Sequence, residues 1–168
     1  MPSARRPAPA LVALGYLAFV SLGLPDAVPG VAWPSVREAF DLPQAALGAA
    51  IAAGAIASFV SGATAGRLVE RFGVGALLAG STALAALGVA GFAGAPAFAL
   101  FLAAAAIVGF GSGAVDAGLN AYAAHNFPAR HMTWLHAAYS VGAAIGPALV
   151  TAVLGRRASW RAGDAAIA

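Results

Sequence analysis

Charged side chains are absent from four long stretches of this sequence. Residues 7–25, 42–66, 72–115 and 131–155 contain no Asp, Glu, Lys or Arg. Because a transmembrane helix needs about 20 mostly apolar residues, each stretch could cross a bilayer. The third stretch would be about 66 Å long as one helix at about 1.5 Å per residue, so it must reverse once. Its best helix breaker is Gly94–Pro96. The pattern therefore predicts five transmembrane helices.

We expect an all-α membrane protein that begins with a cytoplasmic segment, residues 1–8. Pro25 and Pro29 flank Asp26 in the first span, so the outer half of that span should be kinked and leave carbonyl groups free. Irregular backbone is tolerated in membranes where it is buried in protein or lines water. We expect the first span to end at Trp33-Pro34. The expected spans are 9–32, 44–65, 74–93, 97–122 and 133–154, with 160–168 as the approach to a sixth.

Composition supports a polytopic membrane protein. Hydrophobic residues make up 61% of the 168 and charged residues 9%, and the mean hydropathy is +0.86, whereas soluble domains are nearer 25% charged. The absence of cysteine excludes a disulfide framework and a thiolate metal site. All nine basic residues are Arg and lie between or beside hydrophobic spans, so we do not expect a nucleic-acid partner. We expect no cofactor and no metal.

The N-terminal apolar run could pass for a signal peptide, because Arg5 and Arg6 precede it. It is long, contains Pro25 and is followed by further spans, so we interpret it as a retained first helix. The Arg count in short loops predicts the orientation. With the N-terminus inside, five Arg lie in the cytoplasm and four outside, because the C-terminal tail would be extracellular. Early loops usually dominate, which favours a cytoplasmic N-terminus.

Asp116 is the first candidate functional residue, because it is the only charged side chain in the apolar run Ala97–Tyr122. An acid inside a membrane span costs about 2.5 to 3.5 kcal/mol on insertion scales unless it faces a polar cavity or a partner. Asp116 could therefore face a polar cavity, or it could be a structural latch paired with Arg71 or Arg130. His136, just inside the fifth span, could be a proton relay, or else a histidine at the cytoplasmic end of the span or a packing residue.

The segment Gly66-x-x-x-Glu70-Arg71-x-Gly73 resembles the hallmark loop of the major facilitator superfamily, a family of membrane transporters. It lies between the second and third spans, on the expected cytoplasmic side. The two glycines should let the chain turn tightly, and Glu70 and Arg71 could pair with each other or with helix ends. The family's closing basic pair is replaced by Val74-Gly75.

Two further patterns extend the resemblance. Gly142-x-x-x-Gly146-Pro147 is similar to the Gly-Pro element in the fifth helix of many members, and small residues at this spacing allow close helix packing. In the fourth span, the pattern that ends in Asp116 and Asn120 looks like the fourth helix of the fucose–proton symporter branch. This resemblance implies that Asp116 is the proton-coupling acid and that Asn120, at i+4 on the same face, binds the sugar.

The first helix departs from that branch. When Gly23 and Pro34 are aligned with it, Gly30 falls at the position of the branch's acid, and Asp26 falls where the branch has an amide. Asp26 is therefore a candidate for substrate binding or proton coupling, or else an acid near the outer interface that accompanies a packing kink.

The resemblance covers only the first half of the family's architecture, in which two six-helix halves enclose the substrate near the membrane midplane. We therefore expect the N-terminal half of a bundle of six plus six helices, which a missing C-terminal half or an oligomer would complete. The implied function is secondary active transport of small polar solutes, sugars among them, by proton symport and alternating access. The expected partners are the lipid bilayer, a small polar solute and protons.

Three alternatives stay open: an efflux carrier for drugs or metabolites, a truncated fragment that transports nothing, and a membrane scaffold. An intramembrane enzyme is not expected, because the sequence has no paired acids on one helix, no metal-binding His spacing and no nucleophile motif. The many Ala and Gly residues, with Arg in place of Lys, suggest a GC-rich bacterial genome and hence the plasma membrane.

Overall fold

The computed structural model describes residues 9–26 and 28–154, and within them the only regular secondary structure is α-helical. The segments 1–8 and 160–168, for which we expected a cytoplasmic end and the approach to a sixth span, lie outside the described residues. Within the described part, four segments are long and apolar enough to cross a membrane. The helices are α1 (Pro9–Gly23), α2 (Val28–Ala39), α3 (Ala46–Gly94), α4 (Phe98–Asn126) and α5 (Ala129–Leu154).

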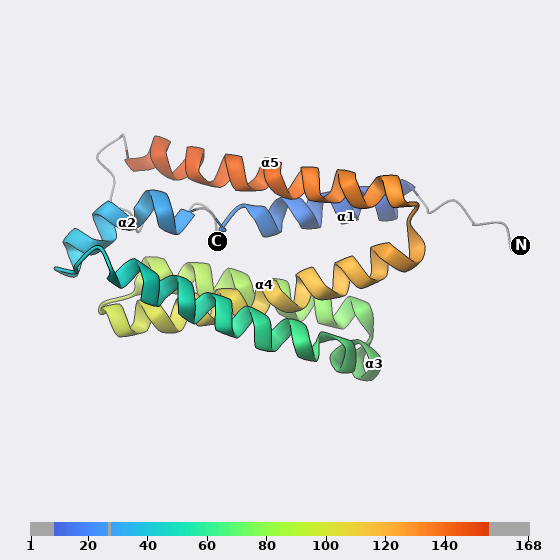
Figure 1. Ribbon diagram of the computed structural model, residues 1–168, viewed down its shortest axis with the longest axis horizontal. Coiled ribbons are helices and arrows are strands. Elements are labelled where there is room, and N and C mark those ends of the chain that lie inside the picture. Colours follow the sequence, from blue (N-terminus) through green and yellow to red (C-terminus); the bar gives the residue numbers. More distant parts are fainter. Residues whose placement is uncertain (1–8, 27, 155–168) are drawn as a thin grey trace, which may run out of the picture.

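Helix α3 is a hairpin of two arms. Its 49 residues would span about 73 Å if straight, more than twice the thickness of a bilayer core of about 30 Å. Gly73 interrupts it with φ 80° and ψ 160°, and the chain doubles back in this region (Figure 1). We call residues 46–72 the first arm and residues 74–94 the second arm.

The turn at Gly73 corrects our expectation for the polar segment 66–73. Residues 66–72 continue the helix, so Gly66 does not take part in the reversal. The physical reason is that Arg, Leu and Glu, which fill most of this segment, are good helix formers. Within the segment 66–73, only Gly73 adopts a positive φ, which glycine tolerates without steric cost.

The first span is broken in the middle, as predicted. Helix α1 ends at Gly23 and α2 begins at Val28, with Pro25 between them. The predicted end at Trp33-Pro34 is wrong, because α2 continues through Pro34 to Ala39. Proline removes one backbone hydrogen bond and crowds the carbonyl four residues earlier, and here that residue is a glycine with open space around it. The predicted hairpin at Gly94–Pro96 is confirmed, since it separates α3 from α4.

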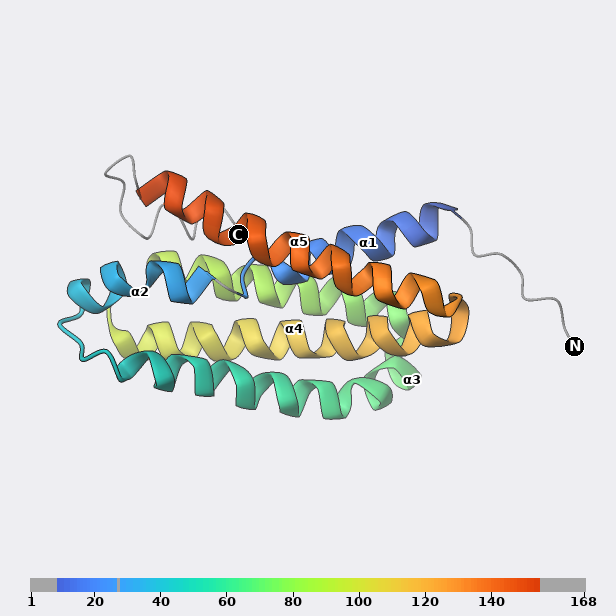
Figure 2. The same cartoon turned by 45° about the horizontal axis from the view of Figure 1, so that its top comes forward.

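The helices form two layers, one of α1, α2 and α5 and one of α3 and α4 (Figures 1 and 2). Contacts are most extensive between α3 and α4, followed by α1 and α5, and few contacts cross between the layers. Two apolar clusters join the layers. The first includes Trp33 and Val36 of α2 with Phe101 of α4, and the second includes Phe19 of α1 with Leu135 of α5 and Leu119 of α4.

Glycines bring α1 and α5 into backbone contact. A Cβ atom at Gly142 would collide with the carbonyl of Val20, and one at Gly146 would collide with the carbonyl of Leu24. From the other side, a Cβ at Gly23 would meet the carbonyl of Tyr139. Pro147 follows Gly146 inside α5 without ending the helix. The end of α1 is therefore held directly against the middle of α5.

Candidate functional site

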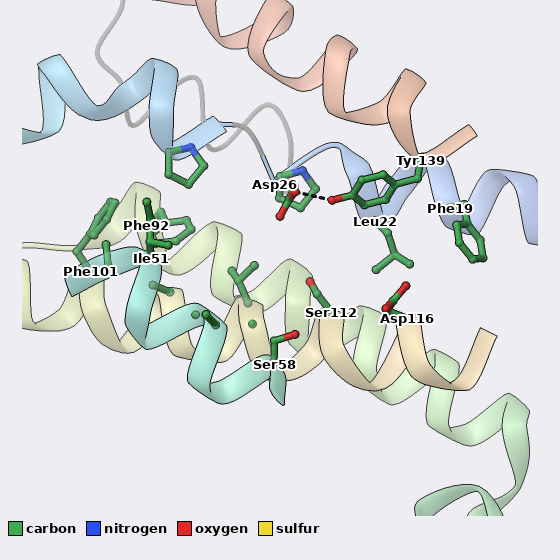
Figure 3. A pocket seen from close by; sticks show the side chains of 18 of the residues that line it. Phe19, Leu22, Asp26, Ile51, Ser58, Phe92, Phe101, Ser112, Asp116 and Tyr139 are labelled. Carbon is green, nitrogen blue, oxygen red and sulfur yellow. Dashed lines mark hydrogen bonds between the residues drawn. The ribbon is translucent and has the colours of Figure 1, made fainter. Parts of the chain in front are cut away.

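A cavity of about 540 Å³ lies between the two layers, and both predicted acids line it. Its walls come from the α1–α2 break, both arms of α3, α4 and α5 (Figure 3). Most lining side chains are apolar. The polar or titratable ones are Asp26, Ser58, Ser112, Asp116, His136 and Tyr139.

Asp26 lies in the break between α1 and α2 and accepts a hydrogen bond at Oδ2 from the Tyr139 hydroxyl (Figure 3). The break itself follows from the sequence, because Pro25 has no N–H to continue the ladder of α1. The contact of Gly23 with α5 brings Tyr139 next to this break. Asp26 is exposed, so its carboxylate remains accessible in the cavity.

Asp116 projects from α4 on the opposite side of the cavity, with Ser112 one helical turn earlier (Figure 3). Nδ2 of Asn120 donates to Oδ1 of Asp116 at 2.8 Å and to the Asp116 carbonyl at 3.0 Å. Asn120 is not among the residues that line the cavity. The structure thus places Asp26 and Asp116 at one cavity. Asn120 lies outside the cavity, one turn after Asp116 on α4, and contacts Asp116 from there.

Small residues of α4 determine which of its faces meets the cavity. A Cβ at Gly109 would collide with the backbone of Gly54, and one at Gly113 would collide with Ser58, so this face packs on the first arm of α3. A Cβ at Gly111 would come within 2.6 Å of backbone atoms in the second arm. Because these faces of α4 pack on the two arms of α3, the face that carries Ser112 and Asp116 points toward the layer of α1, α2 and α5.

His136 lies one turn before Tyr139 on α5 and also lines the cavity. Its ring meets Phe19 edge to face, with 5.7 Å between ring centroids, and its side chain is exposed. His136 thus packs against Phe19 and lines the same cavity as both acids. Its position therefore fits a packing role and a proton-relay role at the same time.

No Arg in the described part of the chain lines the cavity, and the sequence has no Lys. The hydrogen-bond partner of Asp116 is Asn120, so the geometry does not favour the alternative of a latch to Arg71 or Arg130. Arg71 lies instead near the hairpin turn, with its Cζ 5.4 Å from the centroid of the Phe72 ring. Glu70 and Arg71 are both exposed on the first arm.

Sequence reasoning missed Tyr139, Ser112 and Ser58. Ser112 could have been found, because it precedes Asp116 by four residues and must share its helix face. Tyr139 follows His136 by three residues in an otherwise apolar helix, which is a weaker signal. Ser58 is placed only by the packing of the α3 hairpin. Within the described residues, no group of three or more His, Cys, Asp or Glu residues could hold a metal ion.

Comparison with known proteins adds a decisive observation. The family model described as the Major Facilitator Superfamily matches residues 15–167. The chain belongs to the major facilitator superfamily. A search of curated proteins found none that matches it.

Membership of the major facilitator superfamily makes the chain a multi-pass membrane protein of a secondary transporter family, and not an enzyme. Its long apolar helices agree with this. The match identifies the superfamily and gives no support for the fucose–proton symporter branch in particular. In this family the substrate lies between helix bundles near the membrane midplane, and the cavity between the two layers is a candidate for part of that site.

Proposed function

We propose that the cavity between the two layers is a solute-binding and proton-coupling site of a secondary transporter for small polar solutes. The observation that carries this proposal is that Asp26 and Asp116 line one cavity from opposite layers. Acids within membrane spans are expensive and typically mark solute or proton pathways. Here one acid comes from the break between α1 and α2 and the other from α4, and both remain exposed.

In the proposed mechanism, protonation of Asp26 or Asp116 neutralises a carboxylate in the cavity. Loss of the charge changes the electrostatic cost of exposing the cavity to either side, and so it shifts the balance between inward- and outward-facing states. The sparse contacts between the layers are compatible with relative movement. Asn120 would support Asp116 by donating to its carboxylate, and Tyr139 would do the same for Asp26.

The number of spans, their orientation and the membrane also belong to this proposal. We propose that the two arms of α3 are separate spans, which gives five spans with the N-terminus in the cytoplasm of a bacterial plasma membrane. Arg71 and Glu70 would then lie at the cytoplasmic end of the hairpin. An efflux carrier for drugs or metabolites is the second candidate, and the largely apolar cavity lining favours it.

The test is transport in proteoliposomes under an imposed pH gradient, with a panel of sugars, amines and other small solutes. The chain and the longest protein encoded by its reading frame are compared. Accumulation of one solute above its outside concentration, abolished by a protonophore, is expected from at least one of the two proteins. If neither protein accumulates any solute of the panel, the transporter proposal is contradicted and the scaffold interpretation gains support.

A further inference from the structure

Among the residues that the structure describes, the formally charged groups that line the cavity are of one sign. Asp26 and Asp116 supply two carboxylates, no Arg of residues 9–26 and 28–154 lines the cavity, and the chain has no Lys. His136 and Tyr139 are the other titratable groups that line it. In surroundings of low dielectric constant, two carboxylates repel an anion and attract a cation more strongly than they would in water. The net charge of the walls therefore selects the sign of the solute.

The apolar part of the walls also suits a cation. Phe92 and Phe101 line one end of the cavity, with their ring centroids 4.5 Å apart, and Phe19 lines it toward the other end (Figure 3). All three rings are largely buried in the apolar clusters, so each contributes only an edge of its surface to the wall. Aromatic rings attract cations, and the attraction is stronger where water is excluded. They also bury the hydrocarbon of an alkylated amine.

The break in the first span adds a dipole of the same sign. Helix α1 ends at Gly23, beside Asp26, and the C-terminal end of a helix carries a partial negative charge. Pro25 lines the cavity and has no N–H with which to bond the carbonyl of Ser21. Ends of broken helices bind cations in other membrane transporters.

The cavity is poorly equipped for a sugar. Within the described residues, Ser58 and Ser112 supply its only aliphatic hydroxyl groups, and the Asn120 amide donates to Asp116 instead of lining the cavity. A sugar carries many hydroxyl groups, and each one that is buried without a hydrogen-bond partner weakens binding.

We propose that the solute is a small organic cation, an alkylated or protonated amine, held between the carboxylates of Asp26 and Asp116 against the aromatic walls. This inference rests on the proposed function, because it names the substrate class of the same site. It predicts that, of two molecules of equal shape, the protein binds the positively charged one more tightly than the neutral one.

The experiment compares choline with its uncharged carbon isostere 3,3-dimethyl-1-butanol. The full chain is reconstituted in lipid nanodiscs, and displacement of radiolabelled choline is measured with unlabelled choline, the isostere and glucose. We expect choline to bind at least tenfold more tightly than the isostere and glucose. The double variant D26N/D116N should lose this discrimination, and the control D41N, an exposed acid outside the cavity, should keep it.

Equal binding of choline and its isostere overturns the inference, as does preference for glucose or failure of a helical, monodisperse chain to bind choline. The pH-gradient transport assay separates this failure from that of the proposed function. Accumulation of a neutral solute alone would support the transporter proposal and contradict an organic cation as the solute. Charge-selective binding of choline without accumulation of any solute would support the cation site and contradict the transporter proposal.

A second measurement needs no ligand. The chain has no cysteine, so Ser112→Cys can be labelled alone with methanethiosulfonate reagents that carry either trimethylammonium or sulfonate. With rates divided by those of a free thiol in solution, we expect at least a tenfold preference for the cationic reagent. D116N should reduce this ratio severalfold, and D41N should leave it unchanged. A ratio near one in S112C would contradict the inference.

Discussion

Tyr139 and Asp26 are separated by 113 positions in the sequence and joined by a hydrogen bond in the structure. The proximity depends on the backbone contact between Gly23 and α5, so no local pattern could have revealed it. Asp116 was predictable, because a lone acid in a long apolar run is conspicuous wherever it lies in space. The residues that support an acid are thus harder to predict than the acid itself.

Tyr139→Phe should impair the site without unfolding the protein. The substitution keeps the ring and removes the hydroxyl that donates to Asp26, and a hydrogen bond to a charged group contributes about 1.5 to 3 kcal/mol. We expect a severalfold rise in the KM of proton-driven uptake. Tyr122→Phe is the matched control, because Tyr122 lies outside this cavity. Equal uptake kinetics in Y139F and the parent would show that the hydroxyl has no part in the site.

The elements were predicted best where proline or glycine marks them. The hairpin at Gly94–Pro96 and the break at Pro25 are both present. The segment 66–72 was misassigned because its charged residues suggested a loop, although charged residues are also good helix formers. Pro34 was misread as a helix end, since a single proline can be accommodated inside a helix when the preceding turn has room.

Gly146→Ala should separate α1 from α5. The new Cβ would collide with the carbonyl of Leu24, which is backbone and cannot move independently. Overpacking of this kind typically costs about 1 to 3 kcal/mol. The loss is measured by thermal unfolding in detergent. Gly66→Ala is the control, because it lies in a helix with nothing within 4 Å of the added Cβ, and it should be neutral or slightly stabilising. Equal stability of both variants would contradict the close contact.

Gly73→Ala should destabilise the α3 hairpin for a different reason. There is open space around Gly73, but its φ of 80° is unfavourable for any residue with a Cβ, by about 1 to 2 kcal/mol. Gly75→Ala, with space and an ordinary φ, should not have this effect. Thermal unfolding of the two variants in the same detergent compares them. A stability loss in G75A that matches or exceeds that in G73A would argue against the turn at residue 73.

For the molecule as a whole, composition and charge-free stretches predicted the all-α membrane class, and the family match confirms the superfamily. The division into two layers with a cavity between them was not predicted. It arises because glycines pair α1 with α5 and α4 with α3 far more closely than either pair approaches the other. Such pairing depends on how the surfaces of two helices fit together, and one sequence does not show which helix each glycine will contact.

The proposed topology of five spans predicts alternating accessibility along the chain. Single cysteines at Gln44, Glu70, Ala97 and His125, introduced into this cysteine-free protein, lie at or near the successive reversals of the chain. In sealed vesicles of known orientation, an impermeant thiol reagent should label positions 70 and 125 from the cytoplasmic side and positions 44 and 97 from outside. Labelling of 44 and 70 from the same side would contradict a separate span for each arm of α3.

The role of Asp116 in proton coupling is tested by Asp116→Asn in the form of the protein that accumulates solute. Asparagine keeps the shape of the side chain and cannot take up a proton. We expect uphill movement driven by a pH gradient to fall to background while exchange of solute across the membrane continues, and the Asp41→Asn control should retain both. Undiminished uphill accumulation by D116N would contradict a proton-coupling role for Asp116 at this cavity.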